Sequence, residues 1–169
     1  MPAIRKARLD ELDSIMPVYD KAKAYMQQSG NPNQWIGGYP SRETIAADIL
    51  AGHCHVLETD DRKLAAVFAY IEGNDPTYSD IFDGAWLNDL PYAVVHRLAS
   101  AGIMHDVARQ CFLWCFGQCP NLRVDTHADN HTMRHILESL GFSRCGIILT
   151  HNGTPRIAYQ KTLDINTKK

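Results

Sequence analysis

The chain has 169 residues, of which 45% are hydrophobic, and carries a formal net charge of −2. That length fills one well-packed core but not two, so we expect a single domain over residues 1–169. Because basic residues are scattered and no apolar run approaches roughly 20 residues, we expect neither a nucleic-acid nor a membrane partner. The opening residues, MPAIRKARLD, include no apolar signal region, so we expect a soluble, cytoplasmic protein.

The first half of the chain predicts a strand, two helices and a hairpin. IRKAR is expected to form a short strand, and the apolar spacing after Asp10, the expected N-cap, predicts a helix with Pro17 as a potential kink. Ser41 is the expected N-cap of a second helix that runs to about Gly52. The segments HCHVLET and LAAVFAYIEG then predict an antiparallel hairpin.

An aromatic loop is expected between the two helices. The segment SGNPNQWIGGYP is rich in turn residues and contains Trp35 and Tyr39. Such aromatic residues either line a substrate site or cover the rim of the core, and both interpretations stay open. We take Trp35 and Tyr39 as candidate substrate-binding residues.

The second half alternates strands and helices. YAVVHRLAS has the continuous apolar character of a central strand, and the helix after it carries one apolar face. LRVDTH predicts another strand, and a helix that starts near Asp129 or Asn130 should end at Gly141. Asn152-Gly153 is a strong hairpin signal between two final strands. The elements together predict an α/β fold with a mixed sheet.

This order of elements resembles the GNAT superfamily of N-acetyltransferases over nearly the whole chain. The most specific piece is DNHTMRHILESLGF, residues 129–142, which is similar to the asparagine-led helix of that family. The resemblance implies a central, mostly antiparallel sheet flanked by helices, with acetyl-CoA as cosubstrate. It also implies direct transfer of the acetyl group to an amine, and it places Asn130 beside the pantetheine arm.

The family's pyrophosphate-binding turn aligns with Ile103–Ala108, but this turn is degenerate. Ile103 replaces a polar residue and Asp106 replaces a small one, so only Ala108 agrees. A carboxylate about 4 Å from a phosphate opposes binding by roughly 1 to 4 kcal/mol. The resemblance assigns cofactor binding to the strand end, the turn and the helix start, at Leu98, Ala99, Ser100, Met104, His105, Asp106, Val107, Ala108, Arg109 and Asn130.

Asp106 has two competing interpretations. As an N-cap it would satisfy the first amides of the helix and compete with phosphate for them. Alternatively, the main-chain N–H groups from Met104 to Arg109 bind the pyrophosphate while Asp106 turns outward. Arg97, His105 or Arg109 would then offset its charge, and this second arrangement is the one we expect.

His96 and Glu72 are the candidate catalytic bases. Strand periodicity predicts that Val94, His96 and Leu98 share one face. The resemblance implies that the acetyl carbonyl pairs with main chain near Leu98, which would place His96 near the thioester. An imidazole can accept a proton from an ammonium, although a hydrogen-bonded core histidine is an equal alternative. For Glu72, a solvated charge at a strand end is the more frequent situation.

Two further features bear on the chemistry. The family often has a tyrosine that protonates the leaving thiolate, and Leu137 stands at that position. The thiolate is then expected to leave unprotonated or to take a proton from water or Tyr159. His127, His131 and His135 recur every four residues, but they complete no zinc pattern, so we expect no metal.

The five cysteines include three at helical spacing, Cys111, Cys115 and Cys119, which are poorly placed for disulfides. We expect reduced thiols, with Cys111 and Cys115 packed in the core.

The sequence therefore predicts an acyltransferase that acts on an amine of a small molecule or peptide. The alternative is a catalytically weak or inactive coenzyme A-binding or regulatory domain, which Asp106 and Leu137 favour. A homodimer is compatible with the sequence.

Overall fold

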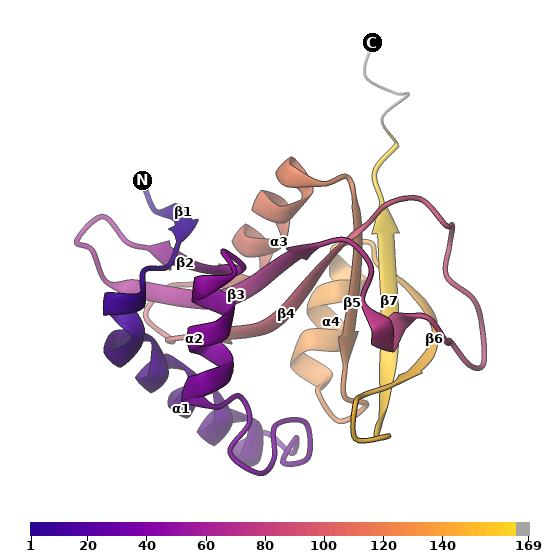
Figure 1. The fold of residues 1–169 in the computed structure, drawn as a ribbon, viewed down its shortest axis with the longest axis horizontal. Helices are drawn as coiled ribbons and strands as arrows, with labels where there is room; N and C mark the ends of the chain where they lie inside the picture. The colour runs from indigo at the N-terminus through magenta and orange to yellow at the C-terminus, as the bar shows by residue number, and fades with distance from the viewer. Residues whose placement is uncertain (165–169) are drawn as a thin grey trace.

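A seven-stranded sheet with helices on both faces forms the centre of the computed structural model, which describes residues 1–164 (Figure 1). The strand order is β1-β2-β3-β4-β5-β7-β6, and β4 and β5 form the one parallel pair within the described residues. The expected mixed, mostly antiparallel sheet is therefore confirmed. The elements in chain order are β1 (Ala3–Lys6), the 3-10 turn η1 (Leu9–Glu11), α1 (Leu12–Gln28), α2 (Arg42–Leu50), β2 (Cys54–Glu58), β3 (Leu64–Glu72), η2 (Pro76–Tyr78), β4 (Ala93–Ser100), α3 (Val107–Gln118), β5 (Asn121–Thr126), α4 (His131–Ser139), β6 (Ser143–Leu149) and β7 (Pro155–Thr162).

Local sequence signals set several element ends as expected. The Ser41 Oγ accepts a hydrogen bond from the Thr44 N–H at 3.1 Å, and α2 begins there. The side chain of Asn130 caps α4 in the same way, through a main-chain N–H of its first turn. Asn152-Gly153 lies in the hairpin that joins β6 to β7.

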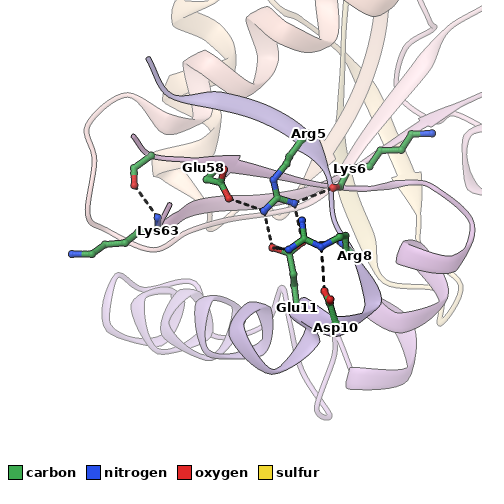
Figure 2. A network of polar contacts seen from close by, with 8 residues as sticks. Arg5, Lys6, Arg8, Asp10, Glu11, Glu58 and Lys63 are labelled. Carbon is green, nitrogen blue, oxygen red and sulfur yellow. Dashed lines mark hydrogen bonds and ion pairs between the residues drawn. The ribbon is translucent and has the colours of Figure 1, made fainter. Parts of the chain in front are cut away.

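The start of α1 differs from the prediction, because Glu11 and not Asp10 stands at its N-cap position. The Glu11 carboxylate accepts the Arg8 N–H at 2.8 Å and two hydrogen bonds from Arg5 at 2.7 and 2.8 Å. Arg5 also donates to Glu58 at 2.7 Å, so one guanidinium ties β1 to β2 and to η1 (Figure 2). The hydrogen bonds from Arg5 lower the pKa of Glu11 to about 2, against the opposing effect of burial.

A bulge interrupts β4 in its middle. His96 pairs with Ala69 and Ala99 pairs with Val67, so Arg97 and Leu98 stand opposite a single residue of β3. Arg97 has a left-handed backbone, with φ of 53°. Because the bulge adds one residue to β4, side chains beyond it point to the face opposite to the one that strict alternation predicts.

The bulge separates side chains that periodicity would place together. Val94 packs with Ile148 and Ala158 on one face of the sheet, and His96 extends toward Asp125 on that same face. Leu98 instead packs against the core on the α3 and α4 face. The expectation that Val94, His96 and Leu98 share one face is therefore wrong for Leu98.

The two parallel strands part soon after they begin. β4 and β5 pair only at Ala93 with Leu122 and at Val94 with Arg123. Beyond that point the strands line a cavity with residues 95–98 and 124–126. The centre of the sheet therefore provides main chain and side chains from two strands to one site.

The cores on the two faces of the sheet hold the helices in place. Cys111 and Cys115 of α3 are fully buried, and burial raises the pKa of the Cys111 thiol to about 12. Both cysteines pack in the core as predicted, and all five cysteines are free.

No helix within residues 1–164 combines the length and apolar character that crossing a membrane requires.

Candidate active site

Two adjoining cavities lie along β4. The first has a volume of about 400 Å³ and the second about 710 Å³. They share four lining residues, Met26, Leu98, Asn130 and Met133. Volumes of this size are typical of small-molecule sites, and the shared residues allow two ligands to meet.

His96 projects from β4 into the first cavity between two carboxylates. Its Nε2 lies 2.8 Å from the Asp75 Oδ2, and its Nδ1 lies 3.9 Å from the Asp125 Oδ2. Asp75 is held in turn by Thr77, which donates to its Oδ1 from the main-chain N–H and from the hydroxyl. The buried Tyr78 hydroxyl donates to Asp125 at 2.7 Å. Both carboxylates therefore have fixed positions around the ring.

The protonation state of Asp75 decides which nitrogen of His96 is open. Burial acts to raise the pKa of Asp75, but hydrogen bonds from His96 and Thr77 outweigh it and hold that pKa below its ordinary value. An ionised carboxylate can only accept, so the His96 Nε2 carries the hydrogen. The Nδ1 lone pair, which no described residue hydrogen-bonds, is then left to accept a proton at the cavity.

Glu72, the other candidate base, lies away from both cavities. It is exposed at the end of β3, accepts a hydrogen bond from the Tyr70 hydroxyl at 2.9 Å, and lines neither cavity. The structure therefore does not bring this second candidate base to His96. The sequence analysis missed Asp75 as a site residue, although an aspartate directly before Pro76 is a recognisable turn signal.

The aromatic loop contributes to the first cavity, since Trp35 and Tyr39 both line it. The Tyr39 hydroxyl accepts a hydrogen bond from Arg97 at 3.0 Å. Arg97 also makes two hydrogen bonds of 2.8 Å to the carboxylate of Asp48 in α2. Of the three residues expected to offset the charge of Asp106, Arg97 is thus paired with Asp48, and only His105 and Arg109 line the second cavity beside Asp106.

A glutamine from the same loop links several walls of the first cavity. The Gln34 Oε1 accepts hydrogen bonds from the side chains of Asn130, at 2.9 Å, and Thr126, at 3.3 Å. The main-chain carbonyl of Gln34 accepts from Arg156 at 3.0 Å. Gln34 thus connects β5, α4 and β7 at the site.

The second cavity lies along the turn before α3. The residues expected to bind the cofactor all line it: Leu98, Ala99, Ser100, Met104, His105, Asp106, Val107, Ala108, Arg109 and Asn130. Within the described chain, the main-chain N–H groups of residues 103–109 donate no hydrogen bond. Lys21 of α1 also lines the cavity and donates to the Ala101 carbonyl at 2.7 Å. Unpaired amides at a helix start beside a lysine fit an anionic phosphate group.

Asp106 does not compete for those amides. It stands at the N-cap position of α3 with a left-handed backbone, φ of 61°, and its side chain makes no capping hydrogen bond. The interpretation in which its carboxylate satisfies the helix is therefore wrong. Asp106 is exposed and lines the second cavity, so its charge acts there only through space.

The position of the family's tyrosine and the expected substitute, Tyr159, both lie away from the two cavities. Leu137 is fully buried in the core of the α3 and α4 face. Tyr159 is fully buried in the same core, and its hydroxyl accepts a hydrogen bond from Arg134 at 3.4 Å. The structure therefore does not bring Tyr159 to the site.

The histidine series near α4 makes local contacts. His127 accepts a hydrogen bond from the Asp129 N–H at 3.0 Å, and burial lowers the pKa of His127. Among residues 1–164, no three His, Cys, Asp or Glu side chains are grouped so that they could hold a metal ion.

The chain is similar to solved structures of acetyltransferases. A GNAT-family acetyltransferase from Streptococcus agalactiae is 36% identical to it, with 96% of each chain covered and a TM-score of 0.84. A GNAT-family acetyltransferase from Listeria monocytogenes is 20% identical over 96% of this chain and 95% of its own, with a TM-score of 0.71. One from Bacillus cereus is 20% identical over 97% and 99%, with a TM-score of 0.60. No protein-family profile and no curated protein sequence matches the chain.

Proposed function

This chain belongs to the GNAT family of acetyltransferases, and from that premise we propose that it transfers an acetyl group from acetyl-CoA to the amine of a small molecule or peptide. The observation that carries the proposal is the junction of the two cavities. One contains His96 with an open ring nitrogen, and the other is lined by unpaired amides at the start of α3.

On the acceptor side, the residues around His96 prepare the amine. The Asp125 carboxylate and the His96 Nδ1 both face a position where an ammonium can donate to each. The Nδ1 accepts one proton, and Asp75 orients the ring and stabilises the resulting imidazolium. The freed lone pair of the amine is then positioned for direct attack, with no covalent intermediate on the enzyme.

On the cosubstrate side, acetyl-CoA supplies the thioester that is cleaved. The N–H groups from Met104 to Arg109 and the Lys21 ammonium would hold its phosphates, and Asn130 lines both cavities at the junction. Since Leu137 has no proton to donate and Tyr159 is buried away from both cavities, the leaving thiolate takes its proton from water.

A catalytically inactive coenzyme A-binding domain is the second candidate, and the buried Leu137 in place of the family's tyrosine favours it. Isothermal titration with acetyl-CoA, followed by a thiol-release assay over a panel of amines, separates the two. Binding with thiol release supports the enzyme, and binding without release from any amine supports the domain. No binding at millimolar acetyl-CoA would contradict both.

A further inference from the structure

Arg156 of β7 is a buried cation with no carboxylate in direct contact. Its residue is 8% exposed, and among residues 1–164 no carboxylate oxygen lies within 4.0 Å of its guanidinium. Its hydrogen bonds go to neutral oxygens, the Pro155 carbonyl at 2.9 Å, the Gln34 carbonyl at 3.0 Å and the Thr154 hydroxyl at 3.4 Å. Burying a guanidinium without a counter-charge is unfavourable, which calls for a reason.

The other inward-facing arginines are each compensated. Arg97 binds Asp48 through Nε and Nη2, with two bonds of 2.8 Å. Arg5 binds Glu11 and Glu58. Arg123 lies against two aromatic rings, 4.2 and 4.1 Å from their centres. Arg156 has neither kind of direct contact, and the Asp125 carboxylate acts on its guanidinium only through space.

Two donors of Arg156 are still available. A guanidinium has five N–H groups, and the three hydrogen bonds of Arg156 use both hydrogens of Nη1 and one of Nη2. Nε and the second hydrogen of Nη2 have no acceptor among the described residues, and Nε is not sealed from solvent. Arg97 uses the same two nitrogens, Nε and Nη2, to bind the carboxylate of Asp48.

Arg156 faces the cavity of His96. It lines the first cavity together with Asp75, His96 and Asp125. Asp125 pairs with Ala158 across β5 and β7, so Arg156 is its diagonal neighbour on the same face, roughly 7 to 8 Å away between main chains. The cavity therefore has an acidic end beside the catalytic base and a basic end at Arg156.

We propose that the acceptor substrate is a free amino acid, whose ammonium binds between His96 and Asp125 and whose carboxylate binds Arg156. The inference rests on the proposed acetyl transfer and narrows its acceptor. An amino acid has its ammonium and carboxylate on one carbon, a spacing that suits two groups on neighbouring strands. The N-terminal amine of a peptide has no such carboxylate beside it.

Part of the remaining lining is apolar, beside polar residues that include Thr150, His151 and Asn152. Met26, Trp35, Ile36 and Phe112 line the same cavity of about 400 Å³. Against these four side chains an apolar substituent of the amino acid is favoured over a charged one, because a charge there would lose its water without gaining a partner.

The test compares matched acceptors on the wild-type protein. Alanine, leucine and phenylalanine are each assayed beside their carboxamides, which keep the amine and shape but lose the negative charge. A charge-assisted pair at Arg156 predicts that at least one amino acid exceeds its amide in kcat/KM by roughly 10- to 100-fold. Equal values for all three pairs would overturn the inference and leave acetyl transfer intact. A preference for 1-aminoethylphosphonate over alanine would overturn it in favour of a phosphoryl group.

The variant Arg156→Gln provides a second test. Its measure is the ratio of kcat/KM for an amino acid to kcat/KM for the corresponding carboxamide, both determined on the same protein. The ratio should fall to about one, whatever happens to the absolute rate. Arg144→Gln is the matched control, because Arg144 is an exposed arginine of the neighbouring strand and lines neither cavity. Its ratio should equal that of the wild type. A ratio retained in Arg156→Gln would overturn the inference.

Direct titration separates this inference from the proposed function. If no amine releases thiol, the proposed acetyl transfer is wrong. Calorimetry in the presence of coenzyme A then tests whether the protein binds leucine more tightly than leucinamide. Leucine binding at least tenfold tighter than leucinamide, with the difference lost in Arg156→Gln, supports an amino-acid site. Equal binding of the two overturns it.

Discussion

The Asp75 carboxylate lies 2.8 Å from the His96 Nε2 and joins a turn after β3 to the centre of β4. This contact fixes the ring so that its other nitrogen faces the cavity. Asp75 lines the first cavity, but in the proposed reaction it acts through the His96 ring, so we regard it as a positioning residue.

The variant Asp75→Asn tests that role. The amide can still accept from Thr77, which preserves the turn, but it can donate to Nε2 and favour the opposite tautomer. We expect a fall in kcat of roughly 10²- to 10⁴-fold with acetyl-CoA affinity unchanged. Because a merely structural role would not alter proton transfer, the pH profile of kcat should also lose its dependence on the His96 base. An unchanged rate and profile would remove Asp75 from the mechanism.

His96→Gln removes the base and retains a polar side chain of similar reach. The rate of acetyl transfer should fall by roughly 10²- to 10⁴-fold, the usual contribution of a positioned base. Affinity for acetyl-CoA, measured by isothermal titration, should stay at the wild-type value, because His96 lines only the first cavity. A rate equal to that of wild type would show that another group accepts the proton.

Asp106→Asn and Asp106→Gly should both tighten coenzyme A binding. Each substitution removes a negative charge from the second cavity, and the gain should shrink as salt screens the repulsion. Glycine should not destabilise the protein, because φ is 61° at this position and the side chain caps nothing. Calorimetric titration at low and high salt measures the first effect, and chemical unfolding measures the second.

Asp83 offers a matched control for these variants. It is also an exposed aspartate with a left-handed backbone, φ of 57°, and it lines neither cavity. Asp83→Gly should change backbone strain similarly and leave coenzyme A affinity unaltered. Unchanged affinity in both Asp106 variants at low salt would place Asp106 away from the phosphates.

Acid should weaken the network around Arg5. The pKa of Glu11 is about 2 in the folded chain and close to 4.5 when the side chain is unpaired. The folded state therefore holds this proton less tightly, so the stabilisation is complete above about pH 4.5 and is lost as the pH falls toward about 2. Glu11→Gln should lower the free energy of unfolding at pH 7, and the difference from wild type should shrink across that window.

Urea unfolding at several pH values measures that difference. Asp10→Asn is the control, because the Asp10 side chain is 76% exposed and forms an ion pair only with the exposed Arg8. Its effect should be near zero at each pH. A Glu11→Gln difference that does not vary between pH 7 and pH 2 would contradict the assignment.

The sequence predicted the features of the fold that depend on neighbouring residues. Ser41 and Asn130 cap helices because a short polar side chain can reach an amide within one turn. Asn152-Gly153 marks the last hairpin for a similarly local reason. The family resemblance located the residues along the second cavity, because strand, turn and helix follow one another in the chain.

What the sequence did not show depends on distant segments. Nothing near Arg97 in the chain indicates a bulge, which arises where the register of β4 shifts against β3. The pairing of His96 with Asp75 brings together residues 21 positions apart, across a turn whose path the sequence does not specify. That no carboxylate contacts Arg156 becomes visible only when the strands and loops of residues 1–164 have been placed around it.

Gln34 also has a consequence for how the two substrates influence each other. Its side chain holds Asn130, which lines both cavities, and its carbonyl holds Arg156, which lines the first. A displacement of this one residue therefore shifts a wall of each cavity. Thermodynamic linkage then requires reciprocity: the factor by which acetyl-CoA changes the affinity for the acceptor equals the factor by which the acceptor changes the affinity for acetyl-CoA. Shortening the side chain in Gln34→Ala releases Asn130 from this connection, and the cooperativity between the two ligands should fall in both directions by the same amount.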